Sequence, residues 1–114
     1  MKKVILITGA TSGIGYETAA YLANQGNIVY GAGRRVENLE GLKKVKPIQL
    51  DMTDESSMQL VVDTIIETEG RIDVLVNNAG YGSYGAIEDV TIEEAKQQFE
   101  VNVFGLARLT QLVL

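Results

Sequence analysis

The sequence contains no cysteine and no histidine, and Pro47 is the only proline among its 114 residues. Without cysteine, the chain can form neither disulfide bonds nor thiolate metal sites, and a reducing compartment is compatible with it. Without histidine, it lacks the commonest general base and the commonest side-chain metal ligand. We therefore expect no metal site in this chain.

Positive charge is also scarce, because 10 lysines and arginines stand against 15 acidic residues and leave a net charge of −5. A chain of this sign repels polyanions at long range, which argues against binding to nucleic acid or to an anionic membrane. One small anion can still be held by local backbone dipoles.

Long hydrophobic runs are missing as well. The apolar run at residues 4–7 ends in Thr8 and Gly9, and it is too short for a signal-peptide core or a membrane span. A cytoplasmic location is the default expectation. Since 46% of the residues are apolar and the length is 114, we expect one domain with its own core.

Short apolar runs alternate with amphipathic stretches along the chain. We expect strands at residues 4–7, 27–33, 48–50 and 72–76. We expect helices at residues 13–25 and 36–44, a third helix that begins with a cap at Thr53 or Asp54 and ends near Gly70, and a last helical region that begins with a capping box at Thr91. Pro47 can open the third strand but would be out of place in its middle. This order predicts an α/β fold with a parallel sheet, helices on both faces and strand order 3-2-1-4.

The predicted topology places a ligand crevice before any motif is considered. In open parallel sheets, ligands bind outside the carboxyl ends of the strands, where the strand order reverses. Here that point lies between the first and fourth strands, which end at Thr8-Gly9 and Asn77-Asn78.

Three glycines, Gly9, Gly13 and Gly15, join the first strand to the first helix. Gly9 permits a tight exit from the strand, while the other two allow a pyrophosphate to approach the backbone of the turn, Ile14 included. Unpaired N–H groups and the positive end of the helix dipole would face the phosphates, and Thr11 and Ser12 could add hydroxyl donors. The alternative is a tight turn without a ligand.

The turn at residues 8–15 and the Asn-Asn-Ala-Gly sequence at residues 77–80 resemble the TGxxxGxG and NNAG signatures of the short-chain dehydrogenase/reductases. The resemblance covers essentially all 114 residues. It implies a Rossmann-type sheet and an oxidoreductase that transfers hydride between NAD(P)(H) and a small-molecule alcohol or carbonyl substrate.

The end of the second strand carries Arg34 and Arg35, and no acidic residue that would grip the ribose hydroxyls of NAD. Gly33 leaves space there, and Arg34 can form a bidentate pair with a 2′-phosphate, to which Arg35 adds charge. We therefore expect NADP rather than NAD. The alternative is that both arginines only form a solvated strand end.

The resemblance implies further cofactor contacts. Asp51 would accept a hydrogen bond from the adenine amino group, and the backbone of Met52 would contact the base. Asn78, Ala79 and Gly80 would line the cofactor. The alternatives are that Asp51 caps the following helix and that residues 77–80 form a plain turn.

One residue of the family's catalytic set has a counterpart in this chain. The resemblance implies that Asn102 holds a water in the proton relay, although an asparagine that bends the helix by local bonding has the same pattern. We expect Tyr81, Tyr84 and Gly85 either to line a substrate pocket or to pack on the surface.

The family's Tyr-x-x-x-Lys pair is absent from this chain. We therefore expect residues 1–114 to be an NAD(P)-binding domain truncated before the catalytic segment, and inactive by itself. The alternative is a non-catalytic module that binds NADP(H) or pairs with another subunit. Exposed apolar positions on the last helix predict self-association or aggregation. The resemblance implies that this helix belongs to a dimer or tetramer interface, so we expect a homo-oligomer.

Overall fold

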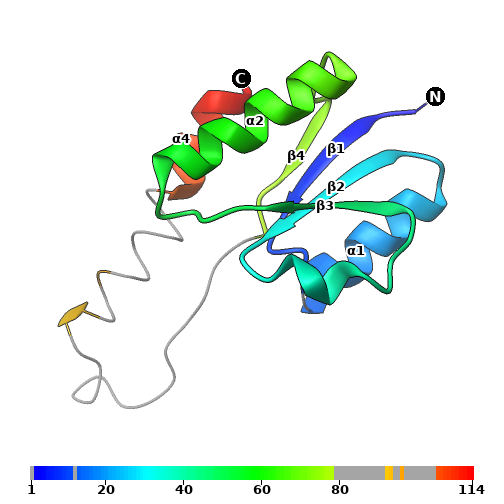
Figure 1. The fold of residues 1–114 in the computed structure, drawn as a ribbon, viewed down its shortest axis with the longest axis horizontal. Coiled ribbons are helices and arrows are strands. Elements are labelled where there is room, and N and C mark those ends of the chain that lie inside the picture. Colours follow the sequence, from blue (N-terminus) through cyan, green and yellow to red (C-terminus); the bar gives the residue numbers. More distant parts are fainter. Residues whose placement is uncertain (1, 12, 79–91, 94–95, 97–104) are drawn as a thin grey trace.

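The computed structural model describes residues 2–11, 13–78, 92–93, 96 and 105–114. Four parallel strands form one sheet in the order β3-β2-β1-β4, which confirms the predicted α/β, Rossmann-type topology (Figure 1). The elements are β1 (Val4–Thr8), α1 (Gly13–Asn24), β2 (Ile28–Gly33), the 3-10 helix η1 (Val36–Leu39), β3 (Val45–Gln49), α2 (Glu55–Glu69), β4 (Val74–Val76) and α4 (Leu106–Val113).

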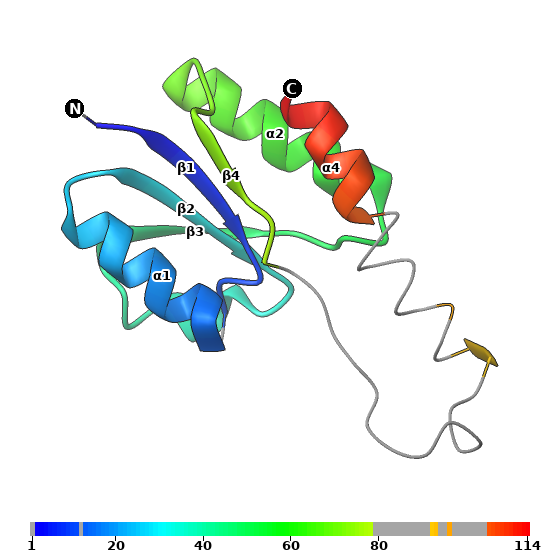
Figure 2. The same cartoon turned by 180° about the vertical axis from the view of Figure 1, so that it is seen from behind.

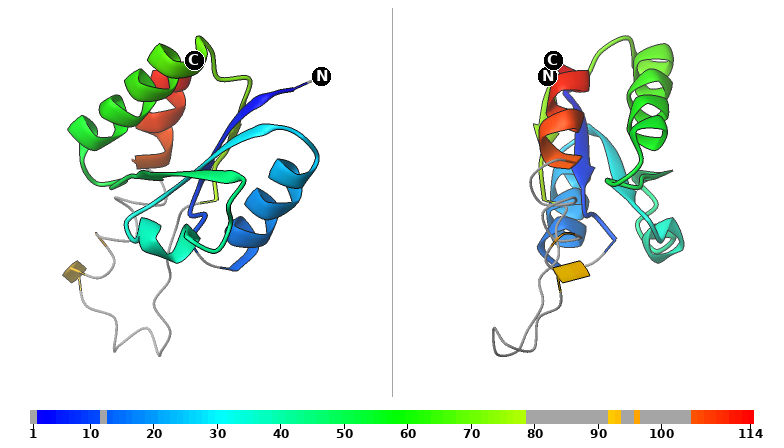
Figure 3. Two further views of the ribbon diagram at one scale, coloured as in Figure 1. Left: turned by 45° about the vertical axis from the view of Figure 1, so that its right-hand side comes forward. Right: turned by 90° about the vertical axis from the view of Figure 1, so that its left-hand side faces the viewer.

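Helices cover both faces of the sheet, as the sequence pattern predicted. α1 lies on one face and α2 with α4 on the other, as Figures 2 and 3 show from two directions. β1 is buried along its whole length. Its side chains alternate, so that Val4 and Leu6 face the α2 side while Ile5 and Ile7 face the α1 side.

α2 has well-defined signals at both ends. The carboxylate of Asp54 accepts hydrogen bonds from the backbone N–H groups of Ser56 and Ser57, at 2.9 and 3.4 Å. Gly70 ends the helix in the left-handed conformation, with φ of 83°. The cap is therefore Asp54 rather than Thr53, and the predicted end at Gly70 is confirmed.

Two expectations for residues 36–50 are wrong. The helix expected over residues 36–44 is only η1, because Gly41 disfavours helix and the chain turns back through Leu42 into β3. β3 begins at Val45, so Pro47 lies in its middle, opposite Gly31. The proline is tolerated because β3 is an edge strand, where one side of the strand has no ladder to lose.

The other described elements occur where they were expected, with small differences in the residues at which they begin or end. β4 is shorter than expected, since it begins at Val74 rather than Ile72. The expected capping box at Thr91 lies outside the described residues. Among the described residues no helix is long and apolar enough to cross a membrane.

Candidate cofactor site

β1 ends in a turn that requires glycine. Gly9 and Gly13 have φ angles of 66° and 58°, in the left-handed region that residues with a β-carbon rarely adopt. Ala10 donates a backbone hydrogen bond to the carbonyl of Ala32 at 3.1 Å, which holds the turn against β2. Of the predicted phosphate-binding residues, Thr11 is half-buried and Ile14 is 77% exposed. Ser12 lies outside the described residues.

The third glycine of the turn is required by space. A β-carbon on Gly15 would lie 2.2 Å from the carbonyl oxygen of Gly9 and 2.5 Å from Nδ2 of Asn78. The first turn of α1 therefore lies close both to the backbone of Gly9, after β1, and to the side chain of Asn78, after β4. This close approach leaves the N–H groups at the start of α1 next to the crevice, where a dinucleotide phosphate would bind.

The exits of β1 and β4 are joined by hydrogen bonds, and they lie side by side in Figure 1. The backbone N–H of Asn78 donates to Oγ1 of Thr8 at 3.0 Å, and Nδ2 of Asn78 donates to the carbonyl of Gly9 at 3.2 Å. The two predicted sequence motifs therefore meet at the predicted switch point. Ala79 and Gly80, which complete the second motif, lie outside the described residues.

Two residues at these exits hold the site together but were not predicted as site residues. Thr8 is fully buried, and its hydroxyl accepts from Asn78 and lies 3.4 Å from the carbonyl oxygen of Val76. Nδ2 of Asn77 donates to Oγ1 of Thr110 at 3.1 Å, which ties the end of β4 to α4. The sequence signal that could have identified Thr8 is a threonine at the end of an apolar strand, because a buried hydroxyl needs hydrogen-bond partners.

β2 ends at Gly33, beside the glycine turn. A β-carbon on Gly33 would lie 2.5 Å from Cγ2 of Thr11, so the room left by the missing side chain is occupied by Thr11 of the glycine turn. Arg34 and Arg35 follow, and both are exposed. The end of β3 is joined to this strand end, because Leu50 donates to the carbonyl of Gly33 at 2.9 Å. Arg34 is thus an exposed residue at the carboxyl end of β2.

Asp51 follows β3 at the same edge of the sheet. Its Oδ1 accepts from the backbone N–H and the hydroxyl of Thr53, at 2.9 and 2.7 Å. These two hydrogen bonds lower the pKa of Asp51 below its ordinary value. Burial opposes them to a lesser extent, and the positive charge of Arg34 makes the smallest contribution to lowering the pKa. The helix cap is Asp54, so Asp51 does not cap α2. The side chain of Met52 is buried in the core.

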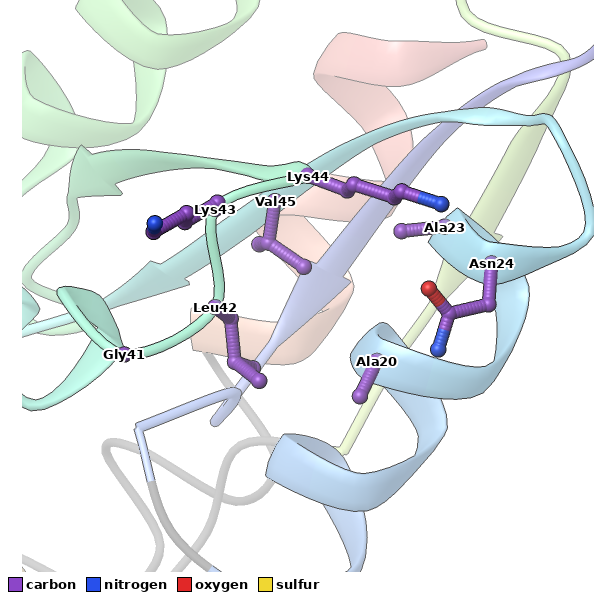
Figure 4. Close-up of a pocket in the computed structure, with 8 residues that line it drawn as sticks. All are labelled: Ala20, Ala23, Asn24, Gly41, Leu42, Lys43, Lys44 and Val45. Carbon is purple, nitrogen blue, oxygen red and sulfur yellow. The ribbon is translucent and has the colours of Figure 1, made fainter.

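A cavity elsewhere in the molecule is separate from this crevice. It measures about 300 Å³ and lies between α1 and the segment that enters β3, where Ala20, Asn24 and Leu42 line it. In Figure 4, Lys44 extends over Ala23 while Lys43 points away. This cavity shares no residue with the glycine turn or with the ends of β2 and β4.

Asn102, the predicted catalytic residue, lies outside the described residues.

The comparisons with known proteins agree with this geometry. The family model described as short chain dehydrogenase matches residues 3–114. A 3-ketodihydrosphingosine reductase from Bacteroides thetaiotaomicron is 45% identical over 98% of this chain and 41% of its own length. The chain thus spans about two fifths of that relative.

Solved structures of similar proteins contain both kinds of nicotinamide cofactor. An alcohol dehydrogenase from Thermococcus sibiricus, complexed with 5-hydroxy-NADP, is 31% identical with a TM-score of 0.91 over 99% of this chain and 52% of that one. A 3-ketoacyl-(acyl-carrier-protein) reductase from Brucella melitensis, complexed with NADH, is 32% identical with a TM-score of 0.89. The match covers 96% of this chain and 47% of that reductase. By the match of its family model and the agreement of its fold, this chain belongs to the short-chain dehydrogenase/reductase family.

Proposed function

We propose that residues 1–114 form the dinucleotide-binding part of an NADP(H)-dependent oxidoreductase, which exchanges hydride between the nicotinamide and a small-molecule alcohol or carbonyl substrate. The observation that carries the proposal is the contact among Gly9, Gly15 and Asn78, where a β-carbon on Gly15 would fall 2.2 Å from a backbone oxygen. Such a close approach brings a helix N-terminus against a strand exit, which is the arrangement that binds a pyrophosphate.

In this proposal the glycine turn, residues 9–15 with Ser12 included, holds the diphosphate. Asp51 and the backbone of Met52 receive the adenine, and residues 78–80 line the adjacent ribose. When bound, the cofactor supplies the hydride, while the described residues bind and orient it. Asn102 remains a proposed member of the proton relay, by family resemblance.

The preference for NADP(H) rests on Arg34. It is the exposed cation at the end of β2, Gly33 beside it has no side chain, and no carboxylate stands at that strand end to repel a 2′-phosphate. Asp51, an acidic group whose carboxylate interacts with the charge of Arg34, follows the next strand and already has one oxygen bonded to Thr53. Arg35, also exposed, adds to the positive field.

Cofactor titration tests this assignment. We expect the complete reading frame that contains this chain to bind NADPH more tightly than NADH, and Arg34→Ala to weaken NADPH binding by about tenfold or more, because a charge-assisted contact is lost. Arg71→Ala is the matched control, since Arg71 pairs with Asp73 just before the start of β4, whereas Arg34 follows the end of β2. Equal affinity of the unmutated protein for both cofactors would contradict the NADP(H) assignment.

The hydride-transfer part of the proposal has a separate test. We expect the reading frame downstream of Leu114 to encode a serine followed by Tyr-x-x-x-Lys, because a carbonyl reduction needs a tuned acid near the substrate oxygen. NADP(H) binding without that segment would instead support the binding or subunit-pairing module.

We also propose that the complete protein is a cytoplasmic homo-oligomer. The large exposed apolar side chains expected on the last helix are not found among the described residues of α4, because Leu109 is buried and Leu112 and Val113 pack against the same core. The proposal rests instead on α2, where Leu60 is 67% exposed. Sedimentation of the complete protein measures this, and a well-folded monomer at high concentration would contradict it.

A further inference from the structure

The carboxylate of Asp51 is held on one side only. Its Oδ1 receives both hydrogen bonds from Thr53, whereas Oδ2 accepts no hydrogen bond among the residues that the structure describes. A carboxylate anchored through one oxygen has little freedom to rotate about its terminal torsion, which is otherwise broad. The second oxygen therefore keeps a fixed direction.

The backbone of Asp51 is anchored as well. Its N–H donates to the hydroxyl oxygen of Ser57, in the first turn of α2, at 2.9 Å. The residue before it, Leu50, donates to the carbonyl of Gly33 at 2.9 Å and is 2% exposed. Asp51 is thus attached to β2 on one side and to α2 on the other, so its position is set by the sheet rather than by a free loop.

We propose that Thr53 is a positioning residue for base recognition: it fixes the carboxylate of Asp51 so that Oδ2 selects a purine bearing an exocyclic amino group. The inference rests on the proposed function, because it concerns the same dinucleotide site. An ionised carboxylate accepts hydrogen bonds and cannot donate them, so a base with an amino group at that position fits and a base with a carbonyl oxygen there is repelled.

The charge state of Asp51 supports the same role. Both hydrogen bonds from Thr53 favour the ionised carboxylate and lower the pKa of Asp51, so the acceptor persists to a lower pH than in an unassisted aspartate. Removing the Thr53 hydroxyl should raise that pKa toward its ordinary value of 3.8. The pH below which the preference for an amino-bearing base is lost would therefore rise as well.

The test compares NADPH with its hypoxanthine analogue, in which a carbonyl oxygen replaces the amino group of the adenine. In Thr53→Val we expect the preference for NADPH over the analogue to fall about fivefold, as one hydrogen bond to a charged group is lost. Thr53→Ser keeps the hydroxyl and should retain the preference. Thr64→Val is the matched control, because the Thr64 hydroxyl donates a 2.7 Å bond to Leu60 on the exposed face of α2.

The outcomes separate this inference from the proposed function. If Asp51→Ala abolishes the base preference while Thr53→Val leaves it intact, Thr53 has no positioning role and the inference is wrong. If neither variant changes the preference but Arg34→Ala still weakens NADPH binding, the cofactor site stands and base selection by Asp51 fails. Thermal unfolding of each variant shows whether a loss reflects folding, and Thr53→Ser supplies the folded comparison.

Discussion

At the scale of single residues, the absence of a side chain is the main requirement at the cofactor site. Gly15 has an ordinary helical position in α1, so its role is not to provide an unusual backbone angle. Its role is to let α1 approach the backbone of Gly9 and the side chain of Asn78, because a β-carbon would overlap the carbonyl of Gly9 and the side-chain amide of Asn78. The close approach of α1 to the ends of β1 and β4 depends on that space.

Gly15→Ala should therefore damage both stability and binding. Because the added carbon would fall 2.2 Å from the carbonyl oxygen of Gly9, we expect a loss of about 1–3 kcal/mol of unfolding free energy. We also expect NADPH binding to weaken, since the turn and the Asn78 side chain must move apart. Urea unfolding and cofactor titration measure the two effects.

Gly41→Ala is the matched control for this prediction. A β-carbon there would lie 3.7 Å from the Tyr16 hydroxyl, an ordinary contact. We expect its unfolding free energy to stay within about 0.5 kcal/mol of the unmutated protein. A Gly15→Ala variant as stable and as tightly binding as Gly41→Ala would show that the close approach is not needed.

At the scale of secondary-structure elements, β4 is attached to β1 at both ends. The crevice end is held by Asn78 and Thr8. At the other end, Oδ2 of Asp73 accepts from the backbone N–H of Val4 at 2.7 Å and from Arg71 at 2.9 Å. Since β4 has only three residues and pairs with β1 alone within the described part of the sheet, these end contacts supply much of what fixes its register.

The Asp73 contact should make part of the stability dependent on pH. The hydrogen bond from Val4, followed by that from Arg71, lowers the pKa of Asp73 in the folded chain. A lowered folded pKa contributes stability above the ordinary value of 3.8, and that contribution is lost as the pH falls through the folded pKa. We expect Asp73→Asn to be less stable than the unmutated protein at neutral pH, with a difference that shrinks in acid.

Urea unfolding at a series of pH values from about 6 to about 3 measures this difference. Asp63→Asn makes the same change of charge on the exposed face of α2, where Asp63 accepts only from Gln59 among the described residues. A constant difference between Asp73→Asn and the unmutated protein at every pH would contradict the assignment.

At the scale of the whole molecule, the sheet separates two cores of different composition. The core on the α1 side includes Ala10, Ala19 and Ala23, whose small side chains let α1 pack closely against the sheet. The core on the other side contains larger side chains, with Ile65 of α2 and Leu109 of α4 both fully buried. A hydrogen bond of 2.7 Å from the Tyr30 hydroxyl to Glu69 further ties β2 to α2.

Ile65→Ala should show how far stability depends on the second core. Ile65 is 0% exposed, so we expect a loss of about 2–5 kcal/mol, a large share of what a domain of this size has. The neighbouring Ile66 is 43% exposed, and Ile66→Ala should cost less than about 1 kcal/mol. Similar losses for both variants, measured by urea unfolding, would contradict this assignment of the core.

The sequence alone was enough for the order of strands, the burial of residues 4–7, the end of α2 at Gly70 and the meeting of the two motifs at the switch point. Each of these depends on local chemistry or on the fixed handedness of the crossovers, both of which can be read from residue patterns. Expectations for Ala79, Gly80 and Asn102 remain predictions, because these residues lie outside the described part of the chain.

Only the tertiary structure decided the place of Pro47, the helix cap, and the roles of Thr8 and Thr53. Proline is acceptable in β3 because that strand is at the edge, and edge position follows from the assembled sheet. Asp51, Thr53 and Asp54 are all plausible helix caps by residue type. The path of the chain from β3 into α2 determines that Asp54 accepts from the first turn of the helix, whereas Asp51 accepts from Thr53. Residue patterns indicate which groups are available, whereas packing determines which of them meet.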